Sequence, residues 1–174
     1  MKPSQNLEAD LIFLHVGESR RKADTPASRS ANDLALAELH DFLLEHALRP
    51  DDVIFNEGSG LSRNDLTSAA ATVSLLTFMH AHREQAAFVD ALPIAGVDGS
   101  LRRRFKGTPA ENNLHAKTGS LRWANSLSGY LTTTSGEPVV FSLMLNRYSS
   151  PTGRESRQEL DDLVALIAGY ETHK

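Results

Sequence analysis

Four consecutive residues, Lys117 to Ser120, have side chains suited to binding an extended peptide. They lie in the strand-like segment "LHAKTGSLRW", residues 114–123. A lysine ammonium attracts a carboxylate, hydroxyl groups donate hydrogen bonds to it, and a glycine leaves the backbone accessible. An ordinary strand end with a turn glycine has the same pattern, so this segment alone leaves both interpretations open.

A second short pattern, "SQN" at Ser4–Asn6, pairs a hydroxyl with an amide two positions later. A three-residue pattern occurs often by chance, and the simplest role for Ser4 is to cap a helix. The two patterns are more specific together, because S-x-N followed by K-T-G is typical of serine acyl-transfer enzymes. In such enzymes a serine attacks an amide carbonyl, and nearby groups move its proton to the leaving amine.

The sequence does not contain the residue patterns that other kinds of catalytic site require. There is no cysteine, and the seven histidines form no H-E-x-x-H pattern, so we expect no metal site. A G-x-S-x-G elbow is absent because "NEGSG" has Glu57 at the first glycine position. No phosphate-binding loop is present either, and we expect no cofactor.

Composition narrows the class of protein further. The chain has 174 residues, 40% of them hydrophobic, which suits one globular domain. A net charge of −4 gives no reason to expect nucleic acid, and the basic run Arg102–Arg104 is interpreted as a solvated loop. No apolar run reaches the ~18 residues of a membrane span, and the start of the chain as given has no signal peptide.

The first half of the chain, about 4–92, is predicted to be mainly helical. Leu7, Leu11 and Leu14 share one helical face, widened by neighbouring apolar residues, so we expect a well-buried helix that ends at Gly17. Ser30 with Asp33 resembles a capping box for a helix over 31–47. "DVIF" is a candidate strand, Thr67 is the expected cap of a helix through "SAAATVSLLTFMHAH", and a shorter helix stops before Pro93.

The second half is predicted to be a loop over 93–113, then a sheet with a terminal helix over 114–170. Three strand-like segments fall within 114–147, and the "TSGE" turn containing Gly136 signals a hairpin. A stripe of Leu160, Leu163, Val164 and Ile167 then predicts a helix over 155–169 that packs on the sheet. The plan is α+β, with helices followed by an antiparallel three-stranded meander.

Longer blocks of the chain resemble a known family. The segments "SQNLEADLIF", "EGSGLSRND", "LPIAGVDGSLRRRF" and "HAKTGSL" look like the C-terminal part of a D-alanyl-D-alanine carboxypeptidase/endopeptidase, a class C low-molecular-mass penicillin-binding protein. The resemblance runs over nearly all of 1–174 and implies part of a penicillin-binding-protein/β-lactamase-like transpeptidase fold. Glu57 stands where the family usually has Asp, which keeps the charge.

The resemblance implies roles for residues of both patterns. Ser4 and Lys117 would be catalytic, with Ser4 in the proton relay to the leaving D-Ala and Lys117 near the substrate carboxylate and the attacking serine. Asn6, Thr118, Gly119 and Ser120 would bind substrate. Because relay members must touch, we expect Ser4 Oγ and Lys117 Nζ within ~3 Å, or one water further. From the residues themselves, Ser59 and Ser62 are expected to fix a turn that gives structural support beneath the site, where Arg63 would pair with a carboxylate.

The nucleophile of the family, the serine of an S-x-x-K pattern, has no good match here. The one such sequence, "SRRK" at Ser19–Lys22, follows the S-x-N and has charged neighbours, so we interpret it as chance. This chain alone is therefore expected to be inactive. Without the N-terminal part of the family, the sheet should expose an edge and one apolar face, through which a homo-oligomer could form.

Three functions remain open at this point. The first is a serine-type D-Ala-D-Ala carboxypeptidase/endopeptidase acting on peptidoglycan stem peptides in the periplasm or another extracytoplasmic space. It would bind stem peptide or β-lactam when completed by the N-terminal part. The second is an inactive remnant or peptidoglycan-peptide-binding module. The third is a structural α+β domain unrelated to the cell wall.

Overall fold

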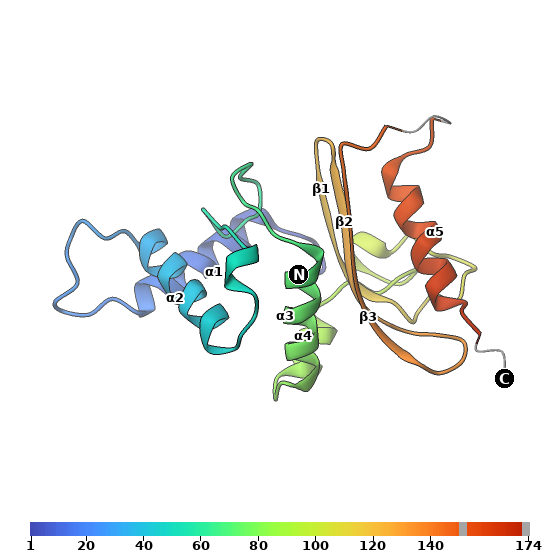
Figure 1. The fold of residues 1–174 in the computed structure, drawn as a ribbon, viewed down its shortest axis with the longest axis horizontal. Helices are drawn as coiled ribbons and strands as arrows, with labels where there is room; N and C mark the ends of the chain where they lie inside the picture. The colour runs from blue at the N-terminus through green and yellow to red at the C-terminus, as the bar shows by residue number, and fades with distance from the viewer. Residues whose placement is uncertain (150–152, 172–174) are drawn as a thin grey trace. The chain divides into compact units, whose positions relative to one another are not determined.

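The chain forms two compact units in the computed structural model, which describes residues 1–149 and 153–171. One unit is Gln5–Ser74, and the other combines Met1–Ser4 with the chain from Leu75 onward. Figure 1 shows helices in the first half and a sheet with a terminal helix in the second. The predicted α+β plan is confirmed.

The unit 5–74 is built on two helices, α1 (Asn6–Ser19) and α2 (Ala31–Glu45). Gly17 lies inside α1, so the prediction that it ends the helix is wrong. A Cβ at this position would lie 2.0 Å from the carbonyl oxygen of Ala31 and 2.6 Å from the backbone nitrogen of Ala35. The glycine is therefore required by the close approach of α2, not by a helix end.

The apolar stripe of α1 is largely exposed, which contradicts the predicted burial. Leu7 is 68% exposed and Ile12 is 66% exposed. Phe13 is covered within the unit, since a Cβ on Gly58 would lie 2.4 Å from its Cβ. The periodicity of apolar residues predicted the helix correctly but not which of its side chains are buried. α2 and the 57–59 turn pack against only one side of α1.

The capping of α2 matches its prediction. Ser30 Oγ accepts a hydrogen bond from the Asp33 backbone nitrogen at 3.1 Å, and Asp33 Oδ2 accepts one from the Ser30 backbone nitrogen at 2.9 Å. Because each residue caps the other, two unpaired donors of the first turn are satisfied, and the capping box is confirmed.

Two predictions between α2 and the next long helix are wrong. A 3₁₀ turn, η1 (Pro50–Asp52), includes the first residue of "DVIF", and the rest of that segment forms only an isolated bridge from Ile54 to Leu66 instead of a strand. The helix α3 (Ala69–Ala81) is capped by Ser68, whose Oγ accepts from the Ala71 backbone nitrogen at 3.0 Å. The sequence offers Thr67 and Ser68 as adjacent capping hydroxyls, and the second one is used.

The other unit contains α4 (Gln85–Asp90), the 3₁₀ turn η2 (Gly99–Leu101) and a sheet ordered β1–β2–β3. The strands are β1 (His115–Leu121), β2 (Ala124–Thr132) and β3 (Pro138–Asn146), paired antiparallel, with Lys117 opposite Ser128. Gly136, with φ 82°, turns the second hairpin. The predicted three-stranded meander is therefore confirmed.

One face of the sheet is covered by α5 (Ser156–Ala168), as Figure 1 shows. The core between them contains Ala116, Leu127 and Phe141 from the sheet and Leu160 and Val164 from the helix. The predicted packing of this helix is confirmed.

Arg104 is also attached to α5, through hydrogen bonds to Asp161, and its side chain is only 14% exposed. The interpretation of 102–104 as a solvated loop is thus wrong for Arg104.

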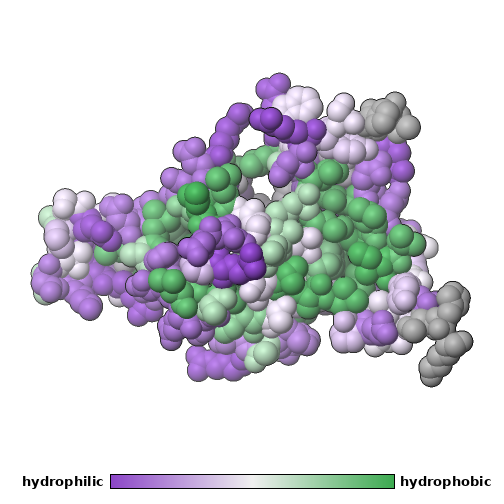
Figure 2. All heavy atoms as spheres, in the orientation of Figure 1, coloured by the Kyte–Doolittle hydropathy of each residue, from purple (hydrophilic) through white to green (hydrophobic). Residues whose placement is uncertain are grey.

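The outer edge of β3 is open, because no strand among residues 1–149 and 153–171 pairs with it. The predicted exposed edge is confirmed. The sheet face opposite α5 was predicted to be apolar, but it also carries polar side chains. Ser126, Ser128 and Ser142 lie on this face together with Lys117. Figure 2 shows apolar side chains gathered where β3 and α5 lie. Leu163 and Leu166 of α5 are both exposed.

Candidate active site

The side chains of Ser4 and Lys117 meet. Lys117 Nζ donates hydrogen bonds to Ser4 Oγ at 2.7 Å and to the Thr118 carbonyl oxygen at 2.7 Å. Both residues belong to the same compact unit, in which Ser4 follows a turn closed by its backbone nitrogen and the Met1 carbonyl. The predicted distance of ~3 Å is confirmed.

Lys117 is partly removed from water, and this burial lowers the pKa of its amine. Loss of solvation disfavours the ammonium form, since no carboxylate lies in its described contacts to compensate. An amine in this state can donate to an anionic ligand, and it gives up its own proton more readily than an ordinary surface lysine, so a larger fraction of it is neutral and able to act as a base. Ser4 Oγ, as its partner, keeps its own proton available for another acceptor.

The outer edge of β1 is occupied before Lys117, and after it no backbone group of residues 1–149 and 153–171 pairs with this edge. The Ala116 backbone nitrogen donates to the Pro93 carbonyl at 3.0 Å, and the Ala95 nitrogen donates to the Leu114 carbonyl at 3.0 Å. Backbone groups of alternate residues point to the same edge of a strand, so Thr118 and Ser120 turn theirs outward beyond this point. Their N–H groups are therefore placed to pair with an added strand or to bind an oxyanion.

The remaining residues of the K-T-G pattern are held by contacts that the sequence did not predict. Thr118 Oγ1 and Ser100 Oγ share a hydrogen bond of 2.9 Å. A Cβ on Gly119 would lie 2.3 Å from Ser126 Oγ of β2. Gly119 thus makes room for a neighbouring side chain of the sheet, which adds a reason for glycine beyond approach by a ligand.

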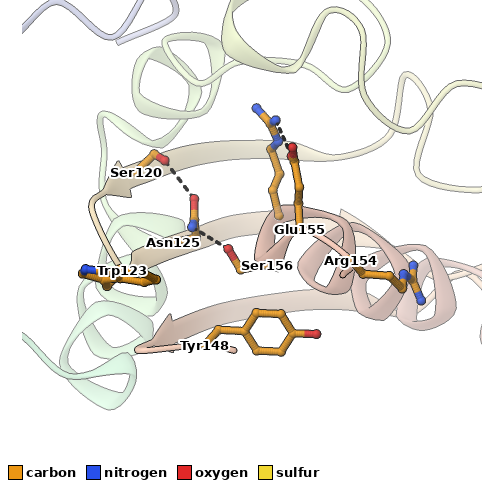
Figure 3. A pocket seen from close by; sticks show the side chains of 8 residues that line it. Ser120, Trp123, Asn125, Tyr148, Arg154, Glu155 and Ser156 are labelled. Carbon is orange, nitrogen blue, oxygen red and sulfur yellow. Dashed lines mark hydrogen bonds and ion pairs between the residues drawn. The ribbon is translucent and has the colours of Figure 1, made fainter. Parts of the chain in front are cut away.

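Ser120 begins a chain of hydrogen bonds that reaches α5, drawn in Figure 3. Its Oγ donates to Asn125 Oδ1 at 2.8 Å, and Asn125 Nδ2 donates to Ser156 Oγ at 2.7 Å. These residues line a pocket of about 390 Å³ together with Trp123, Tyr148, Arg154, Glu155 and Arg157. The end of β1 is thereby fixed to the start of α5.

Asn6 is the one predicted site residue that does not belong to the same compact unit as Lys117. It is the exposed first residue of α1 and belongs to the unit 5–74, whereas Ser4 belongs to the other unit. The N-cap of α1 is Gln5, so Ser4 is not a helix cap. The hydroxyl of Ser4 is committed to Lys117 instead.

The "GSGLSR" block forms a turn around the Glu57 carboxylate, which accepts from the backbone nitrogens of Ser59, Leu61 and Ser62. Burial raises the pKa of Glu57, but hydrogen bonds from Ser59 and Ser62 outweigh it and lower the pKa to about 2. The predicted supporting role of the two serines in a turn is confirmed. The pairing of Arg63 with a carboxylate stays a prediction.

The "SRRK" match has no catalytic geometry. Ser19 Oγ donates to the Val16 carbonyl at 2.7 Å at the end of α1, and the Lys22 backbone nitrogen donates to Thr25. Such back-bonding is ordinary for a serine in the last turn of a helix.

Neither a metal centre nor a membrane helix appears within the described part of the chain. No group of three or more histidine, cysteine, aspartate or glutamate side chains there is arranged to hold a metal ion. No helix formed by those residues is both long and apolar enough to cross a bilayer.

Comparison with known proteins gives consistent matches. The model of the D-Ala-D-Ala carboxypeptidase 3 (S13) family matches residues 1–167. The D-alanyl-D-alanine carboxypeptidase DacB of Haemophilus influenzae is 34% identical over 152 residues, covering 86% of this chain and 31% of its own. The D-alanyl-D-alanine carboxypeptidase of Actinomadura sp. is 30% identical over 176 residues, covering 98% of this chain and 31% of its own.

The fold matches as well. A crystal structure of penicillin-binding protein 4 (dacB) from Haemophilus influenzae, complexed with a β-lactam, has a TM-score of 0.81 and 30% identity. It covers 98% of this chain, which in turn covers 40% of that structure. The expected partial penicillin-binding-protein fold is confirmed, and the chain spans 31% of the length of the two carboxypeptidases it matches.

Proposed function

Because this chain belongs to the D-Ala-D-Ala carboxypeptidase 3 (S13) family, we propose that it forms part of the active site of a serine-type D-Ala-D-Ala carboxypeptidase/endopeptidase. The substrate would be a peptidoglycan stem peptide, in the periplasm or another extracytoplasmic space. Residues 1–174 would be the C-terminal part of one transpeptidase-like domain. The observation that carries the proposal is the 2.7 Å hydrogen bond between Lys117 Nζ and Ser4 Oγ.

Binding would use the open part of the β1 edge. The terminal carboxylate would accept hydrogen bonds from Thr118 Oγ1 and lie in the positive potential of Lys117. The backbone of the peptide would pair with Thr118 and Ser120 as an added strand. Asn6 would bind a substrate amide from the start of α1.

Acylation would proceed by attack of a serine oxygen on the carbonyl carbon of the penultimate D-Ala. A C–O ester bond forms, and the proton of the attacking hydroxyl passes to the relay that contains Ser4. The bond from that carbon to the nitrogen of the last D-Ala breaks, and the amine leaves with a proton. Ser4 Oγ is suited to hand over that proton, because Lys117 Nζ holds the oxygen and leaves its hydrogen free. The Ser120 N–H would stabilise the oxyanion.

The attacking serine is proposed to come from outside these 174 residues, since Ser19 is engaged with Val16. That observation also favours a second candidate, in which the chain binds stem peptides without cleaving them. Self-association through the open edge of β3 is a further part of the proposal, to be checked by sedimentation velocity over a range of concentrations.

The test is equilibrium binding, followed by NMR, of an N-acylated peptide ending in D-Ala-D-Ala and of its L-Ala-L-Ala diastereomer. We expect shifts at Ser4, Lys117, Thr118 and Ser120 that saturate with the D,D peptide and not with the L,L peptide. Absence of binding, or equal binding of both peptides, would contradict the proposed function.

A further inference from the structure

We propose that the segment Asp98–Ser100 is a positioning element of this site, which places Ser4 by holding Lys2 and orients the Thr118 hydroxyl through Ser100. The ligand chosen for the test, and the parts of it assigned to Ser4 and Thr118, rest on the proposed function. The contacts themselves all lie within one compact unit.

The first arm of this element holds the start of the chain at Lys2. Lys2 Nζ lies 2.5 Å from Asp98 Oδ2, and the Ser100 backbone nitrogen donates to the Lys2 carbonyl at 3.2 Å. Asp98 is itself fixed, because its Oδ1 accepts from the Ile94 backbone nitrogen at 2.8 Å. Lys2 is thus bound through both its side chain and its backbone.

Gly99 makes this double contact possible. Its φ is 55°, and a Cβ there would lie 2.6 Å from the Lys2 carbonyl oxygen and 3.1 Å from the Pro93 Cβ. Any side chain at this position would push Lys2 away. Because Ser4 follows Lys2 by two residues in a turn closed at Met1, the place of the Ser4 hydroxyl depends on the Asp98–Ser100 segment.

The second arm reaches the K-T-G strand. Ser100 Oγ and Thr118 Oγ1 are 2.9 Å apart. When Ser100 is the donor, the oxygen of Thr118 is occupied and its single proton is directed to another acceptor, such as a carboxylate. A hydroxyl that accepts one hydrogen bond also donates a stronger one. Ser100 would therefore act on the ligand through Thr118.

The two arms predict different effects on ligand binding. Loss of the Ser100 hydroxyl should weaken ligands with a terminal carboxylate more than those with a terminal amide, because a charged acceptor gains more from the Thr118 hydrogen bond. Loss of the Asp98 charge loosens Lys2 and then Ser4, which faces the peptide bond and not the terminal carboxylate. It should therefore weaken ligands with and without that carboxylate alike.

The experiment compares an N-acylated D-Ala-D-Ala peptide with its C-terminal amide, using the whole chain. Ser100→Ala is expected to lower the preference for the acid over the amide by about fivefold, the effect of one hydrogen bond. Ser100→Thr should restore it, and Ser28→Ala, at an exposed serine of the 20–30 loop, should change nothing. Asp98→Asn should weaken both peptides by about two- to threefold.

A second readout needs no ligand. Three-bond couplings of Thr118 report its χ1 rotamer, which should be single in the native chain and averaged in Ser100→Ala. An unchanged rotamer, or an unchanged acid-to-amide ratio, overturns the role of Ser100. If neither peptide binds the native chain, the proposed function is wrong. The three-bond couplings of Thr118 then decide by themselves whether Ser100 positions Thr118.

Discussion

Lys117 Nζ and Ser4 Oγ are 2.7 Å apart although 113 positions separate the two residues in the chain. The amine also donates to the carbonyl of its own neighbour, Thr118. Two of its three donor positions are therefore filled in the absence of ligand, which leaves one for a carboxylate.

Replacing Lys117 with alanine should weaken binding of the D-Ala-D-Ala peptide by about 10- to 100-fold. A hydrogen bond to a charged group contributes about 1.5–3 kcal/mol, and the variant also releases Ser4. Calorimetric titration measures the change. The control is Lys106→Ala, at an exposed lysine that contacts the Gly96 carbonyl and Glu111 and should bind as the native chain does.

The pKa of Lys117 should lie below the ordinary lysine value of 10.5 because burial disfavours the ammonium form. Between the lowered pKa and 10.5 the folded state binds fewer protons than the unfolded state, so stability rises with pH across that window. Heteronuclear NMR titration of the Lys117 side chain should find the midpoint of its deprotonation below pH 10.5. In Lys117→Met this part of the pH dependence of unfolding should disappear. A midpoint for Lys117 at or above pH 10.5 would refute the burial argument.

Incubation of the chain with a penicillin should leave its mass unchanged. No serine described at the site has a lysine three positions later, and Ser19 donates its hydroxyl to Val16. Intact-mass spectrometry checks the result, with peptide mapping of any adduct. A stoichiometric mass increase located at Ser19 would show that "SRRK" is a working nucleophile after all.

Gly129→Ala should destabilise the sheet by about 1–3 kcal/mol, the usual cost of overpacking. A Cβ there would lie 2.1 Å from the His115 carbonyl oxygen and 2.6 Å from the Ala116 Cα, both backbone atoms of β1. Urea denaturation measures the loss. The matched control is Gly169→Ala, where the nearest atom is 3.3 Å away and little change is expected. Equal stability of both variants would contradict the β1–β2 register.

Much of the sheet half was predictable from sequence because its signals are local. Alternation, turn residues and the stripe ending in Ile167 determine three strands and a covering helix. The Ser4–Lys117 contact was also predictable, but only by way of the two motifs and the chemistry they share. Nothing in the spacing of Ser4 and Lys117 alone brings them together.

The contacts of Ser100 and Gly17 were not predictable, for a shared reason. Ser100 meets Thr118 only after a loop folds back on a strand, and a serine in a glycine-rich loop has no pattern that signals this. Gly17 follows an apolar helical stripe and so resembles a helix end, while its real role appears only when α2 approaches. Likewise the stripe of α1 indicates which side is apolar but not what covers it.

The boundary between the two compact units falls inside the S-x-N motif, between Ser4 and Gln5. The contacts described for Ser4, with Met1 and Lys117, all belong to the unit that contains the sheet. Transient opening of the 5–74 unit would therefore disorder Asn6 while the hydrogen bond of Ser4 survives. Amide hydrogen exchange would then show weaker protection along α1 than along β1, on the two sides of a motif that is continuous in sequence.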